Sequence, residues 1–310
     1  MAASEQATGS GVQAFRASGV QAGKDGPRLD LAGPEHLNTR TPEHLAPTFS
    51  YRRYREILRQ LRSRGYRFAA FPEAQDLVAC NATFALMRHD IDFDLEKALK
   101  IAEIEADSGV TATYFFMVRT NHYNVFSREG AETVSRILDL GHHLGLHFDC
   151  AAYRDDSRVP AEGGCGRLCQ ACSAEAMMLQ NWFGKAVSIV SYHRPNKIVL
   201  SGEPALSMPL QHTYMPLFVH DLCYRSDSRG EWAFGDPTQS VAFKEGRPLH
   251  VLTHPIWWND PPMPAREILL RFIENRAEIL ERSIATNCTI YQTGQPPAFG
   301  RQPSAPTSGS

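Results

Sequence analysis

Short apolar runs alternate with longer amphipathic stretches through most of this chain, and this alternation most constrains its fold. About seven β-branched or aromatic runs of strand length are separated by segments that repeat apolar residues at helical spacing. The clearest expected strands are residues 84–87, 111–118, 143–149, 187–191 and 249–253, and the clearest expected helices are 50–64, 95–109, 127–140, 168–183 and 265–285. Strands that alternate with helices predict an α/β protein with a parallel sheet wound into a barrel, not a sandwich or a helix bundle.

The composition is that of an ordinary globular protein. Of the 310 residues, 43% are hydrophobic and 21% are charged, and the formal net charge is −2. This near-neutral balance predicts no nucleic-acid partner, and no apolar run approaches the roughly 20 residues of a membrane span. Residues 1–46 and 294–310 are rich in small and polar residues and in proline, so we expect two flexible tails around one domain at 47–293.

The N-terminus and the cysteines indicate the compartment. The first residues, MAASEQATGSGVQAF, lack a basic segment followed by an apolar core, so no secretory signal is expected. Seven cysteines, an odd number in a chain of this length, favour reduced thiols over a disulfide framework. We therefore expect a cytoplasmic protein.

The stretch Arg88-His-Asp-Ile-Asp-Phe-Asp94 places three carboxylates and an imidazole between an apolar run and a helix. Asp90 and Asp92 are two residues apart, so in extended backbone their side chains would point to the same side. Two carboxylates in one pocket repel each other unless a metal ion or a proton compensates. The alternative is an Asp-rich helix start with Asp94 as N-cap and the other side chains solvated.

Polar residues follow the expected strands at the same end each time, as the site residues of barrel enzymes do. They are His89, Asp90 and Asp92, then His147 and Asp149, then His193 and Arg194, then Ser226, Asp227 and Ser228, and finally His254. His147 and Asp149 would share one strand face and could both reach a cation held by Asp92. An Asp/His/His or Asp/His/Asp set suits a catalytic divalent metal such as zinc, whereas a buried histidine hydrogen-bonded to Asp149 is the structural alternative.

Four motifs in this order resemble those of the polysaccharide deacetylase (NodB-homology) family. They are Arg-His-Asp-Ile-Asp-Phe-Asp, Gly-His-His-Leu-Gly-Leu-His-Phe-Asp, Tyr-His-Arg-Pro and Leu-Thr-His-Pro, which together span about residues 84 to 256. The resemblance implies a distorted (β/α)7 barrel. It also implies a metal-dependent amide hydrolase that removes an acyl group, usually acetyl, from an amino sugar, so a carbohydrate substrate is expected.

The resemblance also implies roles for individual residues. Asp90 matches the general base, Arg194 the arginine that orients it, and His254 the general acid. Asp92 and His147 match metal ligands. Ser226 and Asp227 lie where the family keeps an aspartate that tunes the acid, and with Trp257 they are our expected substrate-binding residues. Trp257, Trp258 and Trp232 could offer apolar faces to a sugar ring, although core packing is an equal alternative for each.

The sequence departs from the family pattern at two places. The second metal histidine of the family lies four residues after the first, and that position is Ala151 here. His193 or Asp149 must then supply the third ligand, and we favour His193 because imidazole suits zinc. The Thr-Phe-Asp-Asp opening is replaced by an Asp-x-Asp form, so we expect a divergent branch of the family.

Three alternatives remain at this level. Ala151 leaves open a carbohydrate-binding barrel that has lost its metal site, and the Asp-x-Asp form resembles hydrolases of non-sugar amides. Cys165, Cys169 and Cys172 have the spacing with which radical SAM enzymes hold a [4Fe–4S] cluster. That motif normally follows the first barrel strand, and Cys172 shares an apolar side with Leu179, so we favour a core thiol.

Overall fold

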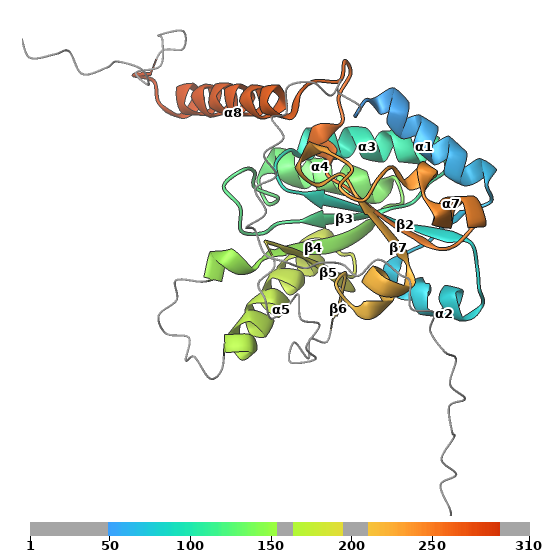
Figure 1. Ribbon diagram of the computed structural model, residues 1–310. Coiled ribbons are helices and arrows are strands. Elements are labelled where there is room, and N and C mark those ends of the chain that lie inside the picture. Colours follow the sequence, from blue (N-terminus) through green and yellow to red (C-terminus); the bar gives the residue numbers. More distant parts are fainter. Residues whose placement is uncertain (1–48, 154–163, 195–209, 292–310) are drawn as a thin grey trace, which may run out of the picture. The chain divides into compact units, whose positions relative to one another are not determined.

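The computed structural model of this protein describes residues 49–153, 164–194 and 210–291. The expected tails 1–46 and 294–310 lie outside these ranges, as do Pro195 and most of residues 154–166, which the sequence pattern predicts to be a loop. The described part is built on a parallel sheet with helices packed against it (Figure 1).

The sheet runs in the order β6-β5-β4-β3-β2-β8-β7, with β1 added beside the start of β2, and the pairings between the described strands are all parallel. The strands are β1 Arg67–Phe68, β2 Phe84–Ile91, β3 Thr113–Phe116, β4 His143–Asp149, β5 Ile189–His193, β6 Gln211–His212, β7 Cys223–Ser226 and β8 Leu249–Thr253. The helices are α1 Tyr51–Ser63, α2 Ala74–Ala79, α3 Leu95–Asp107, α4 Arg128–Asp139, α5 Gly164–Phe183, α7 Val241–Glu245 and α8 Ala265–Asn287. This parallel sheet with its packed helices confirms the expected fold class, an α/β fold with a distorted barrel.

The two faces of the sheet bury two separate apolar clusters. The outer face, which carries Ala85 and Met87 of β2, packs against apolar side chains of α1, α3, α4 and α5. Figure 1 shows α1, α3 and α4 along this side of the sheet. The inner face carries Phe84 and Leu86 in a smaller cluster with Phe71 and Phe218. Because side chains alternate along a strand, Arg88 and Asp90 continue the inner face beyond this cluster.

One glycine on the inner face is required by close packing. Gly145 of β4 pairs with Phe115 of β3, and a Cβ added at Gly145 would lie 2.5 Å from the Phe115 ring. Asp90 is the partner of Phe115 on its other side. The absence of a side chain at Gly145 therefore leaves room for the aromatic ring that packs beside the polar end of β2.

The main difference from the expected elements is the length of β2. A strand was expected over residues 84–87, yet β2 continues to Ile91 and all eight of its residues are buried. Asp90 consequently lies inside the strand, while Asp92 lies in the turn that follows. Asp94 is the N-cap of α3, as expected, and its carboxylate accepts hydrogen bonds from the backbone N–H groups of Glu96 and Lys97.

Smaller differences occur where the local pattern is weak. The sequence pattern also predicts a short strand at 66–71. In the structure this strand is limited to Arg67–Phe68 and is followed by a 3-10 turn at Phe71–Glu73. Helices α2 and α7 and strand β6, none longer than six residues, were not expected from the sequence. No helix in the described ranges has both the length and the apolar character needed to cross a bilayer.

Candidate metal centre

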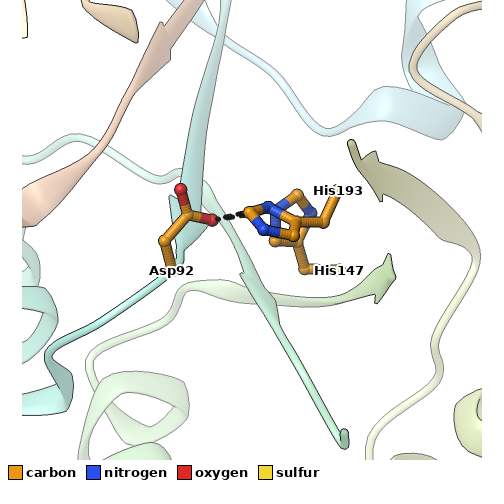
Figure 2. A group of neighbouring side chains, drawn as sticks. All are labelled: Asp92, His147 and His193. Carbon is orange, nitrogen blue, oxygen red and sulfur yellow. Dashed lines mark hydrogen bonds and ion pairs between the residues drawn. The ribbon is translucent and has the colours of Figure 1, made fainter. Parts of the chain in front are cut away.

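Three side chains converge at the carboxyl ends of β2, β4 and β5. Oδ1 of Asp92 lies 3.0 Å from Nε2 of His147 and 3.2 Å from Nδ1 of His193, and these two nitrogens are 3.2 Å apart. Figure 2 shows both imidazole rings turned toward the Asp92 carboxylate. Each residue comes from a different strand end, so the sheet register brings together positions separated by up to about a hundred residues.

This donor set fits a divalent metal ion. In a tetrahedral zinc site, ligand atoms about 2.0–2.1 Å from the ion lie roughly 3.3 Å from one another, which is close to the spacing of the three atoms here. One carboxylate oxygen and two imidazole nitrogens are also the ligand types that zinc prefers in catalytic sites. Asp92, His147 and His193 form the group of metal-ligating side chains found within the described ranges.

The hydroxyl of Ser191 fixes the orientation and tautomer of His147. It accepts a hydrogen bond from the Arg88 guanidinium and donates one to Oδ2 of Asp90 at 2.9 Å. Because the Ser191 hydroxyl already donates its proton to Asp90, Nδ1 of His147 must be the donor in its 3.0 Å contact with the Ser191 oxygen. Nε2 of His147 is then left with a lone pair directed at Asp92 and His193, as a metal ligand requires.

The third position of this cluster belongs to His193. Asp149, the other candidate, accepts hydrogen bonds from the Ala151 N–H at 2.9 Å and from the Arg194 guanidinium. Its carboxylate is therefore engaged away from the other ligand atoms. Arg194 has a backbone φ of 49°, a left-handed conformation that is unfavourable for a residue with a side chain. The contact with Asp149 holds Arg194 in place directly after His193.

The arginine that holds Asp90 is Arg88, not Arg194 as expected. Arg88 donates from Nε to Oδ1 of Asp90 at 2.9 Å and from a terminal nitrogen to Oδ2 at 2.7 Å. Both side chains are buried, and the guanidinium lies between the rings of Phe115 and Tyr214. Burial alone would raise the pKa of Asp90, but the Arg88 charge and hydrogen bonds lower it well below its usual range.

Sequence reasoning missed both Arg88 and Ser191, although strand alternation could have found them. Arg88 is two residues before Asp90 and Ser191 is two residues before His193, so each shares the inner face with a predicted site residue. Their types gave no signal, because a serine inside a strand and an arginine before a histidine are both common on solvated surfaces. Only the pairing of His147 with Ser191 across β4 and β5 identifies the network.

His254 lies opposite this cluster with its two ring nitrogens in different surroundings. Nδ1 is 2.7 Å from Oδ1 of Asp227, and Nε2 is 3.9 Å from Oδ2 of Asp92. Burial by itself would lower the pKa of His254, but the hydrogen bond and charge of Asp227, with Asp92 and Asp90 nearby, raise it to about 9. The His254 ring is therefore protonated at neutral pH, and its Nε2–H is directed toward Asp92 of the candidate metal site.

Asp227 orients His254, which fits the position of the acid-tuning aspartate that the family resemblance implies, and its expected contact with substrate stays a prediction. Its side chain is fully buried and also accepts hydrogen bonds from the His254 backbone N–H and from Nε1 of Trp258. Ser226 is buried too, and its hydroxyl contacts that of Ser228 at 2.6 Å. Trp257 and Trp258 are buried in the outer core. Ser226, Asp227 and Trp257 are thus all buried in the described part of the structure, and substrate binding by them stays a prediction.

Two residues of the loop after β3 hold the turn that carries Asp92. Nδ1 of His122 lies 2.7 Å from the Asp92 carbonyl oxygen, so this nitrogen carries the proton and donates. The Tyr123 hydroxyl donates to the carbonyl oxygen of Ile91 and accepts from the Met117 N–H. The polar sequence of residues 119–124 predicts only a loop after the strand. In the structure this loop positions the end of β2, a role that the sequence did not reveal.

His89 does not belong to the site, although it lies beside Asp90 in the sequence. It points to the outer face of β2, where Nε2 lies 2.9 Å from Oε1 of Glu105. The Glu105 carboxylate is completely buried and also accepts hydrogen bonds of 2.6 Å from the hydroxyls of Tyr54 and Tyr114. This network joins α1, β2, α3 and β3 under the helices.

The cysteine-rich segment forms the start of α5, so Cys165, Cys169 and Cys172 follow one another along a helix. The side chain of Cys165 lies outside the described part of the structure. Cys172 is buried in the outer core with Leu179, and burial raises the pKa of its thiol. Cys172 therefore has the surroundings of a core thiol, and the cluster hypothesis stays a prediction without support from these contacts.

No family model matches this chain, and no curated protein matches it either. Solved structures that match include IcaB from Ammonifex degensii, at 18% identity and a TM-score of 0.36, covering 46% of this chain and 66% of that one. The Streptococcus pyogenes deacetylase PplD in complex with acetate matches at 10% identity and a TM-score of 0.40, covering 68% and 86%.

A third solved structure, a de-N-acetylase from Aggregatibacter actinomycetemcomitans, matches at 13% identity and a TM-score of 0.40, covering 70% of this chain and 89% of that one. The identities and TM-scores are low throughout. They carry no argument about activity, so the function proposed below rests on the residues of the site.

Proposed function

We propose that this protein is a metal-dependent hydrolase that removes an N-acyl group, with acetyl as the expected group, from an amino sugar or saccharide-linked substrate. The observation that carries the proposal is the convergence of Asp92, His147 and His193 within 3.0–3.2 Å of one another, with the His254 ring facing Asp92. The amino-sugar substrate comes from the family resemblance of the sequence motifs.

Asp92, His147 and His193 would hold the metal, which we propose to be zinc. When bound, such an ion supplies Lewis acidity, which activates water and polarises an acyl carbonyl. His193 supplies an imidazole where Ala151 cannot. The loss of the family's usual second histidine is therefore compensated within the site, and this favours an active enzyme over a degraded binding barrel.

Proton transfer in this scheme is divided between Asp90 and His254. Asp90 remains ionised because Arg88 holds both of its oxygens. The family resemblance assigns it to receive a proton from the attacking water. Attack on the carbonyl carbon forms the new C–O bond. His254 then donates its Nε2 proton to the amide nitrogen as the C–N bond breaks, releasing a carboxylate and a free amine. Asp227 stabilises the imidazolium before this donation.

The proposal is tested by metal content and hydrolysis in the same preparations. Purified wild-type protein should contain about one divalent metal ion per chain and release acetate or formate from members of a panel of N-acyl amino sugars. Asp92→Ala and His147→Ala should lose the metal, whereas His254→Ala should retain it and lose hydrolysis.

The matched control is His143→Ala, because His143 is an exposed histidine of the same strand as His147. Wild-type protein without stoichiometric metal after zinc loading would contradict the proposed mechanism. Activity on non-sugar amides alone would leave the mechanism intact and change the substrate class.

A further inference from the structure

Helix α8 has two apolar sides, and only one of them is packed against the domain. Ile268 is buried, and the ring of Phe272 contacts the rings of Phe93 and His122. These contacts attach the first half of the helix to the loops around the metal cluster. The opposite side of the same helix carries a second set of apolar residues that the packing does not use.

This second set forms an exposed stripe with alternating spacings of three and four residues. Its members are Leu270, Ile273, Ala277, Leu280 and Ile284. The four large side chains are 42%, 60%, 61% and 40% exposed in chain order, and no described segment covers them. Spacings of three and four over two heptads define the a and d positions of a coiled coil, with Leu270, Ala277 and Ile284 at a. A stripe of this kind normally packs against another helix.

The charged residues beside the stripe indicate which helix that is. With this lettering Arg276 occupies a g position, and Glu274 and Glu281 occupy e positions. In a parallel pair, a g residue lies beside the e residue of the next heptad on the partner helix. Arg276 of each copy would then lie beside Glu281 of the other, giving two symmetric ion pairs. An antiparallel pair would instead bring glutamates near glutamates.

We propose that α8 associates with α8 of a second copy of this chain as a parallel, in-register, two-stranded coiled coil. The stripe would be buried between the copies, and each domain would remain on the outer side of its own helix, held through Ile268 and Phe272. Ala277 at the central a position allows the two helices to approach closely. The contact covers only about 22 Å of helix, so association should depend on concentration. This inference is independent of the proposed activity.

The first test is the mass of the full-length protein in solution across a concentration series, by sedimentation velocity. Wild type should shift from monomer to dimer as concentration rises. The double variant Ile273→Glu, Leu280→Glu should remain monomeric at every concentration, with unchanged circular dichroism because both side chains are exposed in the monomer. Thr286→Glu, on the same helix but away from the stripe, should dimerise like wild type.

A monomer at all concentrations for wild type would overturn the proposal, as would a dimer that the stripe variant leaves intact. Charge reversal then tests the orientation. Arg276→Glu and Glu281→Arg should each weaken the dimer, and the two changes together should restore it. Failure of the double variant to recover would contradict the parallel arrangement.

Cross-linking provides an independent readout of orientation. In a parallel pair, Ile284→Cys should form a disulfide-linked dimer with itself under mild oxidation, because the two a positions face each other. In an antiparallel pair, in which an a residue faces a d residue of the partner, it should cross-link only when mixed with Ile273→Cys. Wild-type protein, which has seven cysteines of its own, is the control under the same oxidation. A cross-link in the mixture alone would overturn the parallel pair.

Discussion

At the scale of single residues, the ion pair between Arg88 and Asp90 is the contact on which the inner face most depends. Both side chains are almost fully buried, with 2% and 4% of their surface exposed. A buried pair does not by itself stabilise a protein strongly, but removing one partner leaves an unpaired charge in the interior. Arg88 also donates to Ser191, so its loss would disturb the hydrogen bonds that orient His147.

We expect Arg88→Gln to lower the free energy of unfolding by about 3–5 kcal/mol, because Asp90 would remain buried without its counter-charge. Arg136→Gln is the matched control, since Arg136 forms an exposed ion pair with Glu103 and should contribute less than about 1 kcal/mol. Urea denaturation of both variants measures the difference. Equal losses would show that Arg88 does not hold Asp90 in solution.

A second buried carboxylate, Glu175 of α5, has a raised pKa, in contrast to the lowered pKa of Asp90. Burial raises its pKa to about 7, although the Tyr153 hydroxyl donates to it and Arg119 lies nearby. A carboxyl group whose pKa is raised by folding imposes no penalty below its unfolded value near 4.5. Stability is lost as the pH rises from there through the folded value.

Glu175→Gln should therefore match wild-type stability near pH 4.5 and exceed it by about 3 kcal/mol at pH 8, from 1.36 kcal/mol per pKa unit. Urea denaturation at several pH values measures this gain. Glu56→Gln should show a small trend of opposite sign, because hydrogen bonds from Arg59 and Gln60 lower the pKa of the exposed Glu56 to about 2. A gain that did not grow with pH would contradict the assignment.

At the scale of elements, β3 and β4 pack closely because Gly145 has no side chain to contact the Phe115 ring. Gly145→Ala would place a Cβ against the Phe115 ring, whose neighbours on both sides are fixed by the sheet. We expect a loss of about 1–3 kcal/mol from overpacking.

Phe115→Leu should relieve part of that loss, so the double variant should be more stable than the sum of the two single changes predicts. Thermal unfolding of all four proteins completes the cycle. Simple additivity would indicate that the sheet adjusts at Gly145 without contacting the ring.

The sequence predicted elements well where one face alone is apolar, and less well where polar groups are buried. Strands β4 and β8 and the ends of α1, α3 and α4 agree with the expected bounds to within two residues. β2 was expected to end at Met87, because Arg88 and Asp90 look like turn residues until their mutual pairing is known. Short elements such as α2 and α7 escape detection because they are too short to show a period.

Within the site, too, some features could be predicted from the sequence and others could not. Asp92, His147 and His193 were expected as ligands, and the structure brings their ligand atoms together. The contact of Asp227 with His254 was implied by the family resemblance. The contact of Arg194 with Asp149 could not be predicted, because it depends on how a loop folds back over strand ends. The order of the motifs indicates which residues belong to the site. Only the three-dimensional contacts distinguish a side chain that faces substrate from one that supports a neighbouring side chain.

At the scale of the whole molecule, metal binding should be coupled to stability, because Asp92, His147 and His193 come together only in the folded sheet. Zinc at about 100 times its dissociation constant should add about 2.7 kcal/mol. For a domain of this size the melting temperature should rise by roughly 5–10 °C.

Differential scanning calorimetry of metal-depleted protein, with and without zinc, measures the rise. His147→Ala should abolish it and His143→Ala should preserve it. A rise that persists in His147→Ala would place the stabilising metal elsewhere.

The position of β2 in the sheet also has a consequence for biosynthesis. Its neighbour β3 follows closely along the chain, but its other neighbour, β8, is made almost 160 residues later. While the chain emerges from the ribosome, the edge of β2 that later pairs with β8 therefore remains unpaired. Unpaired strand edges of this kind favour aggregation of nascent chains. The proposed ligands can assemble before that edge closes, whereas His254 follows β8 directly. Pairing of β8 with β2 thus also brings the proposed acid, His254, into the site. A nascent chain that still lacks His254 could not be catalytically active.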